Sequence, residues 1–166
     1  MVIIRRRAFT LIELMASVVI VSILVGVAIP VIRSMNENIM MSKTRLSLQQ
    51  DARNIMAMLN RFLREAKASS LVITRYDSSQ PFCSYIKFTT IDSKTYEFYQ
   101  DGKNFMLKQG NMQKVLSQDL RYLSFTFPDT SNMYIVSVSM TFEKALFGGR
   151  KKAIHVASEK IRVMND

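Results

Sequence analysis

A long apolar run near the N-terminus constrains the fold of this chain more than any other feature of the sequence. It extends from Leu14 to Ile32 without an ionisable residue, and three arginines, Arg5 to Arg7, precede it. About 19 residues of α-helix span about 29 Å, which matches the roughly 30 Å hydrocarbon core of a bilayer. The run is too long for the apolar region of a cleavable secretory signal. We therefore expect one transmembrane helix, with the arginines holding its N-terminus in the cytoplasm.

A carboxylate, that of Glu13, lies at the start of this run. A charged residue at the centre of a membrane helix costs about 2.5–3.5 kcal/mol on insertion scales, and the cost falls towards the helix end. Glu13 can avoid that cost by reaching the headgroups, by taking up a proton or by pairing with a positive charge. Ionisable groups in membrane helices usually have a partner and a function, so Glu13 is the first candidate for a functional residue.

The helix predicted for the apolar run continues well beyond it. Apolar residues recur there at steps of three and four, which places them on one helical face. They are Leu48, Ala52, Ile55, Leu59, Phe62 and Ala66. No strong stop signal interrupts this stretch, so we expect one helix from about Phe9 to about Ala68. Pro30, after Gly26, should kink or locally open it, because proline lacks an amide hydrogen and clashes with the preceding turn.

From Leu71 onward the sequence becomes rich in β-branched and aromatic residues. The strand candidates are 71–75, 85–90, 95–99, 105–108, 120–127, 134–142 and 153–163. Asp92-Ser93 and Asp101-Gly102 predict tight turns, which favours a meander. The predicted sheet core comprises Phe82, Tyr85, Ile86, Phe88, Phe98, Phe105, Leu123, Phe125, Phe127, Ile135, Val138 and Met140. The predicted fold class is α+β, a long N-terminal transmembrane α-helix whose C-terminal half packs on an antiparallel β-sheet domain.

The chain carries a formal net charge of +10, of which +7 remains when the three N-terminal arginines are left out. A solvated basic surface explains such an excess, and so does an anionic partner such as DNA, acidic lipid or another subunit. Arg150-Lys151-Lys152 is the only basic cluster past the N-terminus. It follows Gly148-Gly149, which favours a hairpin turn with charged flanks over a dedicated anion site.

Residues suited to catalysis or metal binding are scarce. Cys83 is the single cysteine, so no intrachain disulfide can form. His155 is the single histidine, in an alternating segment that favours a half-exposed place in a strand. The segment 129–132 offers oxygens to Ca²⁺ but matches no known ligand pattern, so we interpret it as an ordinary turn. We expect no enzyme activity, no metal and no cofactor.

The segment Arg7-Ala-Phe-Thr-Leu-Ile-Glu-Leu14 closely resembles the prepilin leader of type IV pilins and of the pseudopilins of type II secretion. The resemblance implies cleavage between Ala8 and Phe9 by a membrane prepilin peptidase, followed by N-methylation of Phe9. Pro30 matches the proline of the family's apolar helix. Ala8 stands where the family usually has glycine, and because alanine is also small we expect cleavage there.

The resemblance also implies a role for Glu13. Cleavage would create a charged amine at Phe9, and Glu13 of one subunit would pair with that amine on a neighbouring subunit during fibre assembly. The implied partners are prepilin peptidase, other major and minor pilin-like subunits, the inner-membrane assembly platform and the membrane itself. Nucleic acid is not expected as a partner unless the fibre serves DNA uptake.

The segments 49–66 and 156–165 resemble minor pseudopilins of the J type and related minor pilins. The expected parts are a cytoplasmic leader, 1–8, a transmembrane and assembly segment, 9–32, an amphipathic segment, 33–70, and an extracytoplasmic β-rich domain, 71–166. We predict a minor subunit that assembles into or primes a pseudopilus for type II secretion. It would first lie in the inner membrane with a periplasmic C-terminal domain. Two alternatives stay open: a minor type IV pilin or competence pseudopilin in DNA uptake, and a membrane-tethered binding domain that does not assemble.

Overall fold

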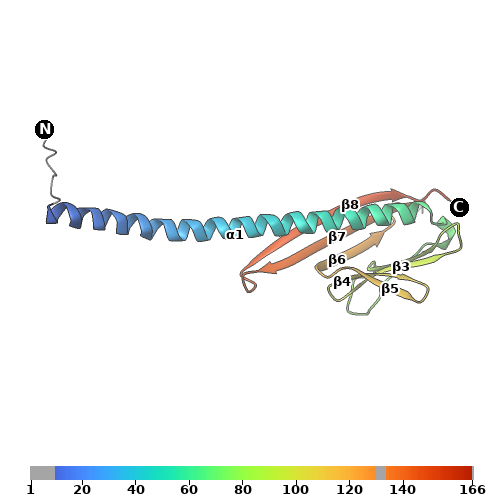
Figure 1. Cartoon of the computed structure of the whole chain (residues 1–166). Helices are drawn as coiled ribbons and strands as arrows, with labels where there is room; N and C mark the ends of the chain where they lie inside the picture. The colour runs from blue at the N-terminus through green and yellow to red at the C-terminus, as the bar shows by residue number, and fades with distance from the viewer. Residues whose placement is uncertain (1–9, 130–133, 166) are drawn as a thin grey trace, which may run out of the picture. The chain divides into compact units, whose positions relative to one another are not determined.

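The computed structural model describes residues 10–129 and 134–165, and its fold is α+β, as predicted (Figure 1). The chain divides into two compact units, residues 1–42 and residues 43–166. Among the described residues, every buried apolar side chain lies between Leu48 and Val163, so the hydrophobic core belongs to the second unit.

A single helix, α1, extends from Leu11 to Arg64. Arg61 and Arg64 lie in its last turn, where positive charge is favourable next to the negative end of the helix dipole. The helix ends before the predicted Ala68, because the backbone after Arg64 hydrogen-bonds to the sheet instead of continuing the helix. The Lys67 amide donates to the carbonyl of Thr89 at 2.9 Å, and a short 3₁₀ helix, η1, then occupies Ala68–Ser70.

The backbone of α1 stays helical through Gly26 and Pro30. Because proline has no amide hydrogen, the carbonyl of Gly26, four residues earlier, loses its normal helical donor. Nothing lies within 4 Å of the position that a side chain at Gly26 would occupy. Bending or local opening at this point stays a prediction.

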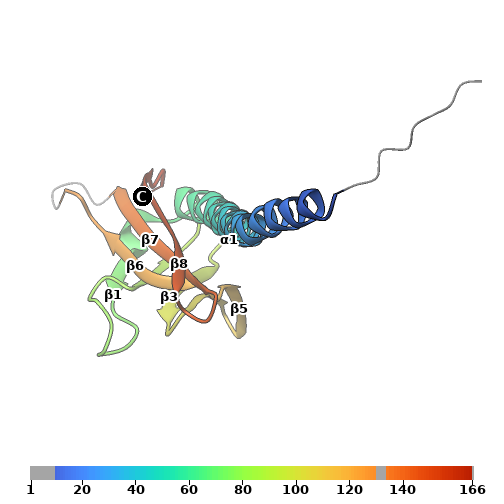
Figure 2. The same cartoon turned by 90° about the vertical axis from the view of Figure 1, so that its left-hand side faces the viewer.

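The strands of the second unit form two antiparallel sheets (Figure 2). The first has the order β1-β2-β3-β4-β5 and consists of β1 (Val72–Thr74), β2 (Tyr85–Thr89), β3 (Thr95–Asp101), β4 (Asn104–Gln109) and β5 (Met112–Ser117). The second has the order β6-β7-β8 and consists of β6 (Leu120–Thr126), β7 (Ile135–Leu146) and β8 (Lys151–Arg162).

All seven predicted strands are present, and the turn predictions are confirmed. Ser93 and Gly102 adopt φ values of 60° and 57° in the turns that precede β3 and β4. The sequence prediction omitted β5, because Met112–Ser117 shows no clean alternation and its side chains are mostly exposed. It also treated the strands as one sheet, whereas β6, β7 and β8 form a separate one.

The core combines the apolar stripe of α1 with inward residues of both sheets. All the stripe residues predicted are buried except Phe62, which is half buried and stacks on Tyr96 with ring centroids 4.5 Å apart. The predicted sheet residues that are buried are Ile86, Phe88, Phe98, Phe105, Leu123, Phe125, Val138 and Met140. Tyr85, Phe127 and Ile135 are half buried. Phe82 was predicted wrongly: it is 74% exposed, because it lies in the loop before β2 with the guanidinium of Arg75 over its ring.

The β7–β8 hairpin turns at residues 147–150, as the glycine pair predicted, and carries an ion-pair cluster on its arms. Glu143 accepts from Arg121 on β6 and from Lys152 on β8, and the Lys152–Glu143 distance is 2.7 Å. The hydrogen bond from Lys152 is the main reason why the pKa of Glu143 lies below its ordinary value. A carboxylate with a lowered pKa stabilises the fold above its unfolded pKa, and this contribution is lost as the pH falls through its folded pKa.

We expect Lys152→Ala to raise the pKa of Glu143 towards that of an ordinary glutamate, because its main hydrogen-bond donor is removed. A carboxylate-detected NMR titration of wild type and variant measures the shift. Lys160→Ala is the matched control on the same strand, since Lys160 forms no ion pair within the described part of the chain. An unchanged Glu143 titration in Lys152→Ala would contradict the assignment.

Candidate functional site

The N-terminus of α1 is organised by two residues, Thr10 and Glu13. The backbone amide of Thr10 donates to Glu13 Oε2 at 3.0 Å, and the Glu13 amide donates to Thr10 Oγ1 at 3.4 Å. The Thr10 hydroxyl also donates to Glu13 Oε2 at 3.0 Å. This reciprocal arrangement is a capping box, which satisfies amides that a helix start otherwise leaves without partners.

The capping box changes the interpretation of Glu13. The sequence suggests headgroups, a proton or a positive charge as ways to accommodate its carboxylate, and the structure adds a local donor, Thr10. The signal was present, because Thr-x-x-Glu before an apolar run is the sequence signature of a capping box. Both described hydrogen bonds reach Oε2, so Oε1 accepts none from the described residues. One carboxylate oxygen therefore remains accessible to a further donor.

The serine hydroxyls of the apolar segment are satisfied within the helix. Its two serines, Ser17 and Ser22, donate their hydroxyls to the carbonyls of Glu13 and Val18, each at 2.7 Å. Bonds of this kind to the preceding turn remove the cost of an unpaired hydroxyl in a lipid environment. The helix is long and apolar enough to cross a membrane by its length and composition.

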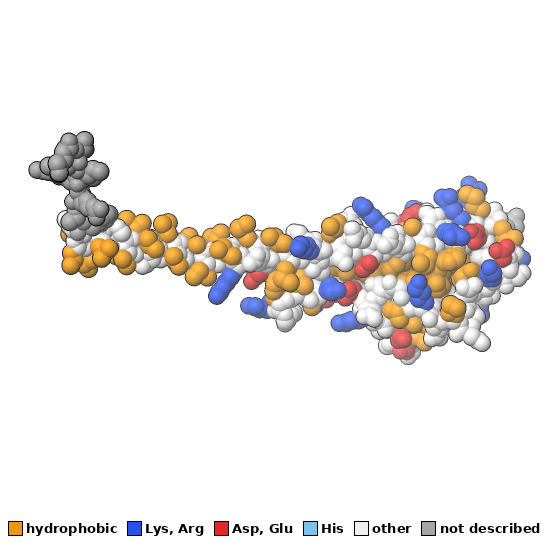
Figure 3. All heavy atoms as spheres, in the orientation of Figure 1, with side chains coloured by type: hydrophobic (Ala, Val, Ile, Leu, Met, Phe, Trp, Pro, Cys, Tyr) orange, Lys and Arg blue, Asp and Glu red, His pale blue; other side chains and the backbone are white. Residues whose placement is uncertain are grey.

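The side chains of this segment are exposed along its length, from Leu11, at 77%, to Ile32, at 57%. Figure 3 shows them as a nearly continuous apolar surface over the first part of α1. The exposed apolar surface continues past the predicted span to Met35 and Ile39. Such a surface needs lipid or neighbouring helices around it, because contiguous apolar area of this size is rarely left in water. The helix is therefore consistent with membrane anchoring.

The other residues singled out from the sequence do not gather into a second site. Ala8 and Phe9 lie outside the described residues, as do residues 130–132 of the segment 129–132. Cys83 is half buried in the loop before β2. His155 is half buried on β8, as predicted. No group of three or more metal-ligating side chains occurs within residues 10–129 and 134–165.

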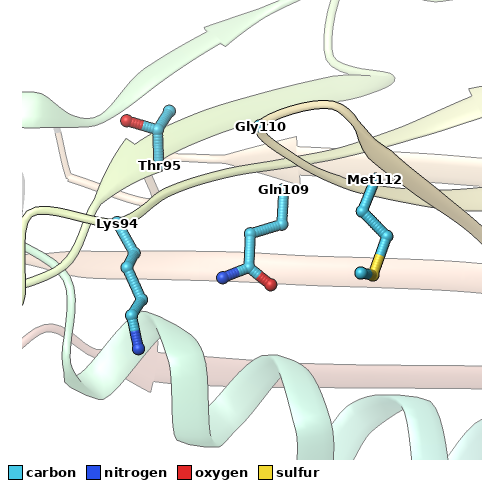
Figure 4. A pocket seen from close by; sticks show the side chains of 5 residues that line it. All are labelled: Lys94, Thr95, Gln109, Gly110 and Met112. Carbon is cyan, nitrogen blue, oxygen red and sulfur yellow. The ribbon is translucent and has the colours of Figure 1, made fainter.

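An open hollow of about 500 Å³ lies where the β2–β3 and β4–β5 turns meet. It is lined by Lys94, Thr95, Gln109, Gly110 and Met112. In Figure 4 the side chains of Lys94, Gln109 and Met112 extend to the same side, and Thr95 points away from them. Lys94 is the single ionisable group of these five, so the hollow brings together neither an acid–base pair nor a nucleophile with its base.

Comparison with known proteins identifies the N-terminal segment alone. Residues 3–29 match the family model described as the prokaryotic N-terminal methylation motif. The match includes Thr10, Glu13 and Gly26, and it ends next to Pro30. No curated protein and no solved structure matches the chain.

Proposed function

Because residues 3–29 carry the N-terminal methylation motif of the type IV pilin and pseudopilin family, we propose that this chain is a minor pilin-like subunit of a type II secretion pseudopilus. The motif itself implies processing by prepilin peptidase and assembly with pilins. The finer proposal is that the processed chain enters or primes the fibre from the inner membrane, with residues 71–166 in the periplasm.

The geometry at the start of α1 is the observation that carries the proposal. Cleavage between Ala8 and Phe9 would leave the Thr10 amide as a peptide N–H, so the capping box would survive processing. The capping box uses Oε2 of Glu13 and leaves Oε1 accessible. That oxygen could accept a hydrogen bond from the new amine of a neighbouring subunit while Glu13 keeps its position. The pair would offset the cost of two charges in a medium of low dielectric constant.

The apolar surface of α1 supports the same function. In the membrane, lipid would cover the side chains from Leu11 to Ile32. In a fibre, the equivalent helices of neighbouring subunits would replace the lipid. The assignment to a minor subunit rests on the resemblance of 49–66 and 156–165 to J-type minor pseudopilins.

The proposal predicts a defined N-terminus in cells with an active prepilin peptidase. Intact-mass spectrometry should find a chain that begins at Phe9 and carries one added methyl group. Cells without the peptidase should retain the leader, 1–8. Ala8→Gly, which restores the residue usual in the family, should be processed at least as fast as the wild type, whereas Ala8→Leu should be processed more slowly.

A chain that keeps Met1 in cells with an active peptidase would contradict the proposal. It would instead favour a membrane-tethered domain that does not assemble. Processing of Ala8→Gly but not of the wild type would trace the failure to Ala8 rather than to the motif as a whole.

A further inference from the structure

Strand β8 has an open edge. It is the last strand in the order β6-β7-β8 and pairs with β7 from Lys151 to Arg162. Within the described residues, no backbone hydrogen bond reaches its other side over this length. Asn165, beyond the end of the strand, forms an isolated β-bridge with Lys67. An open edge of this length is a ready template for another strand.

The register shows which backbone groups face outward. The Val163 amide donates to the Tyr134 carbonyl at 2.7 Å, and this pair continues the β7–β8 register. Hydrogen-bonded pairs alternate along an antiparallel ladder, so the odd-numbered residues of β8 bond to β7. The even-numbered residues from Ile154 to Lys160 therefore direct their N–H and C=O groups to the open edge.

A groove runs between this edge and α1. It has a volume of about 310 Å³ and is lined by Gln49, Ala52, Arg53 and Met56 of α1 and by residues 155–158 of β8. Beside it, the Asn60 amide group donates to Glu159 Oε1 at 2.6 Å and joins the helix to the strand. Val156 is 62% exposed and Ile154 is 47% exposed, which shows that the helix does not cover the outer face of β8. A strand added here would meet α1 on one face and solvent on the other.

The groove and the strand end are positively charged. Arg53, on the helix side, and Lys160 and Arg162, on β8, form no ion pair in the described part of the chain. Glu159 is the one nearby acid on β8, and Asn60 already donates to it. A second copy of this chain would bring the same cations to the edge and be repelled. The charge pattern instead suits an acidic partner.

We propose that the open edge of β8, together with the adjoining face of α1, binds an extended acidic segment of another protein chain by β-strand addition. The segment's backbone pairs with residues 154–160. Its β-branched side chains lie beside Ile154 and Val156 on the outer face of β8, and its carboxylates lie on the opposite face, towards Arg53 of α1. This interaction goes beyond the proposed function and does not depend on processing or on fibre assembly.

The test uses the full-length precursor in a non-ionic detergent and a fluorescent peptide in which valine and glutamate alternate. Fluorescence anisotropy measures binding, and amide hydrogen exchange locates it. We expect saturable binding that protects residues 154–160. A peptide in which lysine replaces each glutamate should bind at least about tenfold more weakly, because the lysine side chains meet Arg53.

Two pairs of variants separate the backbone and charge contributions. Val156→Pro removes an outward amide and should abolish binding, whereas Val156→Thr keeps the amide and should bind like the wild type. Arg53→Glu should weaken binding at least about tenfold, whereas the same charge change in Lys114→Glu, on β5, should not. Urea unfolding of each variant shows whether it is folded. Because Arg53 is exposed on the helix, Arg53→Glu tests the proposal even if Val156→Pro does not fold.

The proposal is overturned by any of three results: absence of peptide binding, equal binding of the lysine peptide, or protection elsewhere than at β8. Displacement of the peptide by single-stranded DNA that protects the same amides would also overturn it. That result would assign the basic surface to nucleic acid instead.

Discussion

Glu13→Val is expected to leave the chain in the membrane but to reduce its incorporation into a fibre at least about tenfold. Insertion should persist because valine is more favourable than glutamate in a membrane helix. Incorporation should fall because the amine of a neighbouring subunit would enter the fibre without its partner. An uncompensated buried charge costs about 3–5 kcal/mol, and 1.4 kcal/mol already corresponds to a factor of ten.

Two further substitutions separate the charge of Glu13 from its role in the capping box. Glu13→Gln keeps the side-chain acceptor for the Thr10 amide, since glutamine also serves in capping boxes, but it removes the negative charge. Thr10→Ala keeps the charge and removes the hydroxyl that accepts from the Glu13 amide. If the charge matters, Glu13→Gln should fail like Glu13→Val. Thr10→Ala should then retain most incorporation, with a cost to the helix start of about 1 kcal/mol.

Two amounts are measured for each variant: the protein that co-purifies with the other pilin-like subunits, and the protein that stays in the membrane fraction. Their ratio reports incorporation. Processing is checked by intact mass in each case, so that a cleavage defect is not mistaken for an assembly defect. Normal incorporation of Glu13→Gln would contradict the pairing role and leave Glu13 with a local role at the start of α1.

The sequence predicted the fold well where local patterns dominate. The apolar run and the stripe from Leu48 to Phe62 are governed by helical periodicity, which does not depend on distant partners. The exposed strand β5 was missed because Met112–Ser117 lies at a sheet edge with no buried face to impose alternation. The division into two sheets was also missed, since strand order is set by tertiary packing and loop geometry rather than by the strands themselves.

The functional residues were likewise predicted where the signal is local and missed where it depends on the folded chain. Glu13 was identified from its cost in a membrane segment, and its local donor, Thr10, was overlooked although the Thr-x-x-Glu signature was present. The open edge of β8 could not be predicted at all. It depends on β8 being last in its sheet and on α1 lying beside it, and both facts appear only in the folded chain.

Leu59→Ala should strongly destabilise the second unit. Leu59 is fully buried, so its truncation leaves a cavity between the helix and the sheets. The expected loss in the free energy of unfolding is about 2–5 kcal/mol. With a urea m-value of about 2 kcal/mol/M, the unfolding midpoint falls by about 1–2.5 M. The chain has no tryptophan, so tyrosine fluorescence of the full-length protein in detergent is the signal.

Leu46→Ala is the matched control, because it makes the same chemical change on the same helix at a residue that is 56% exposed. Its free energy of unfolding should change by no more than about 0.5 kcal/mol, as expected of a surface substitution, so its midpoint should stay close to that of the wild type. Equal midpoints for the two variants would mean that α1 does not pack on the sheets through its apolar stripe. A large effect confined to Leu59→Ala would instead show that the second half of α1 and the sheets unfold as one cooperative unit. In that case the core around Leu59 holds the second half of α1 to the two sheets.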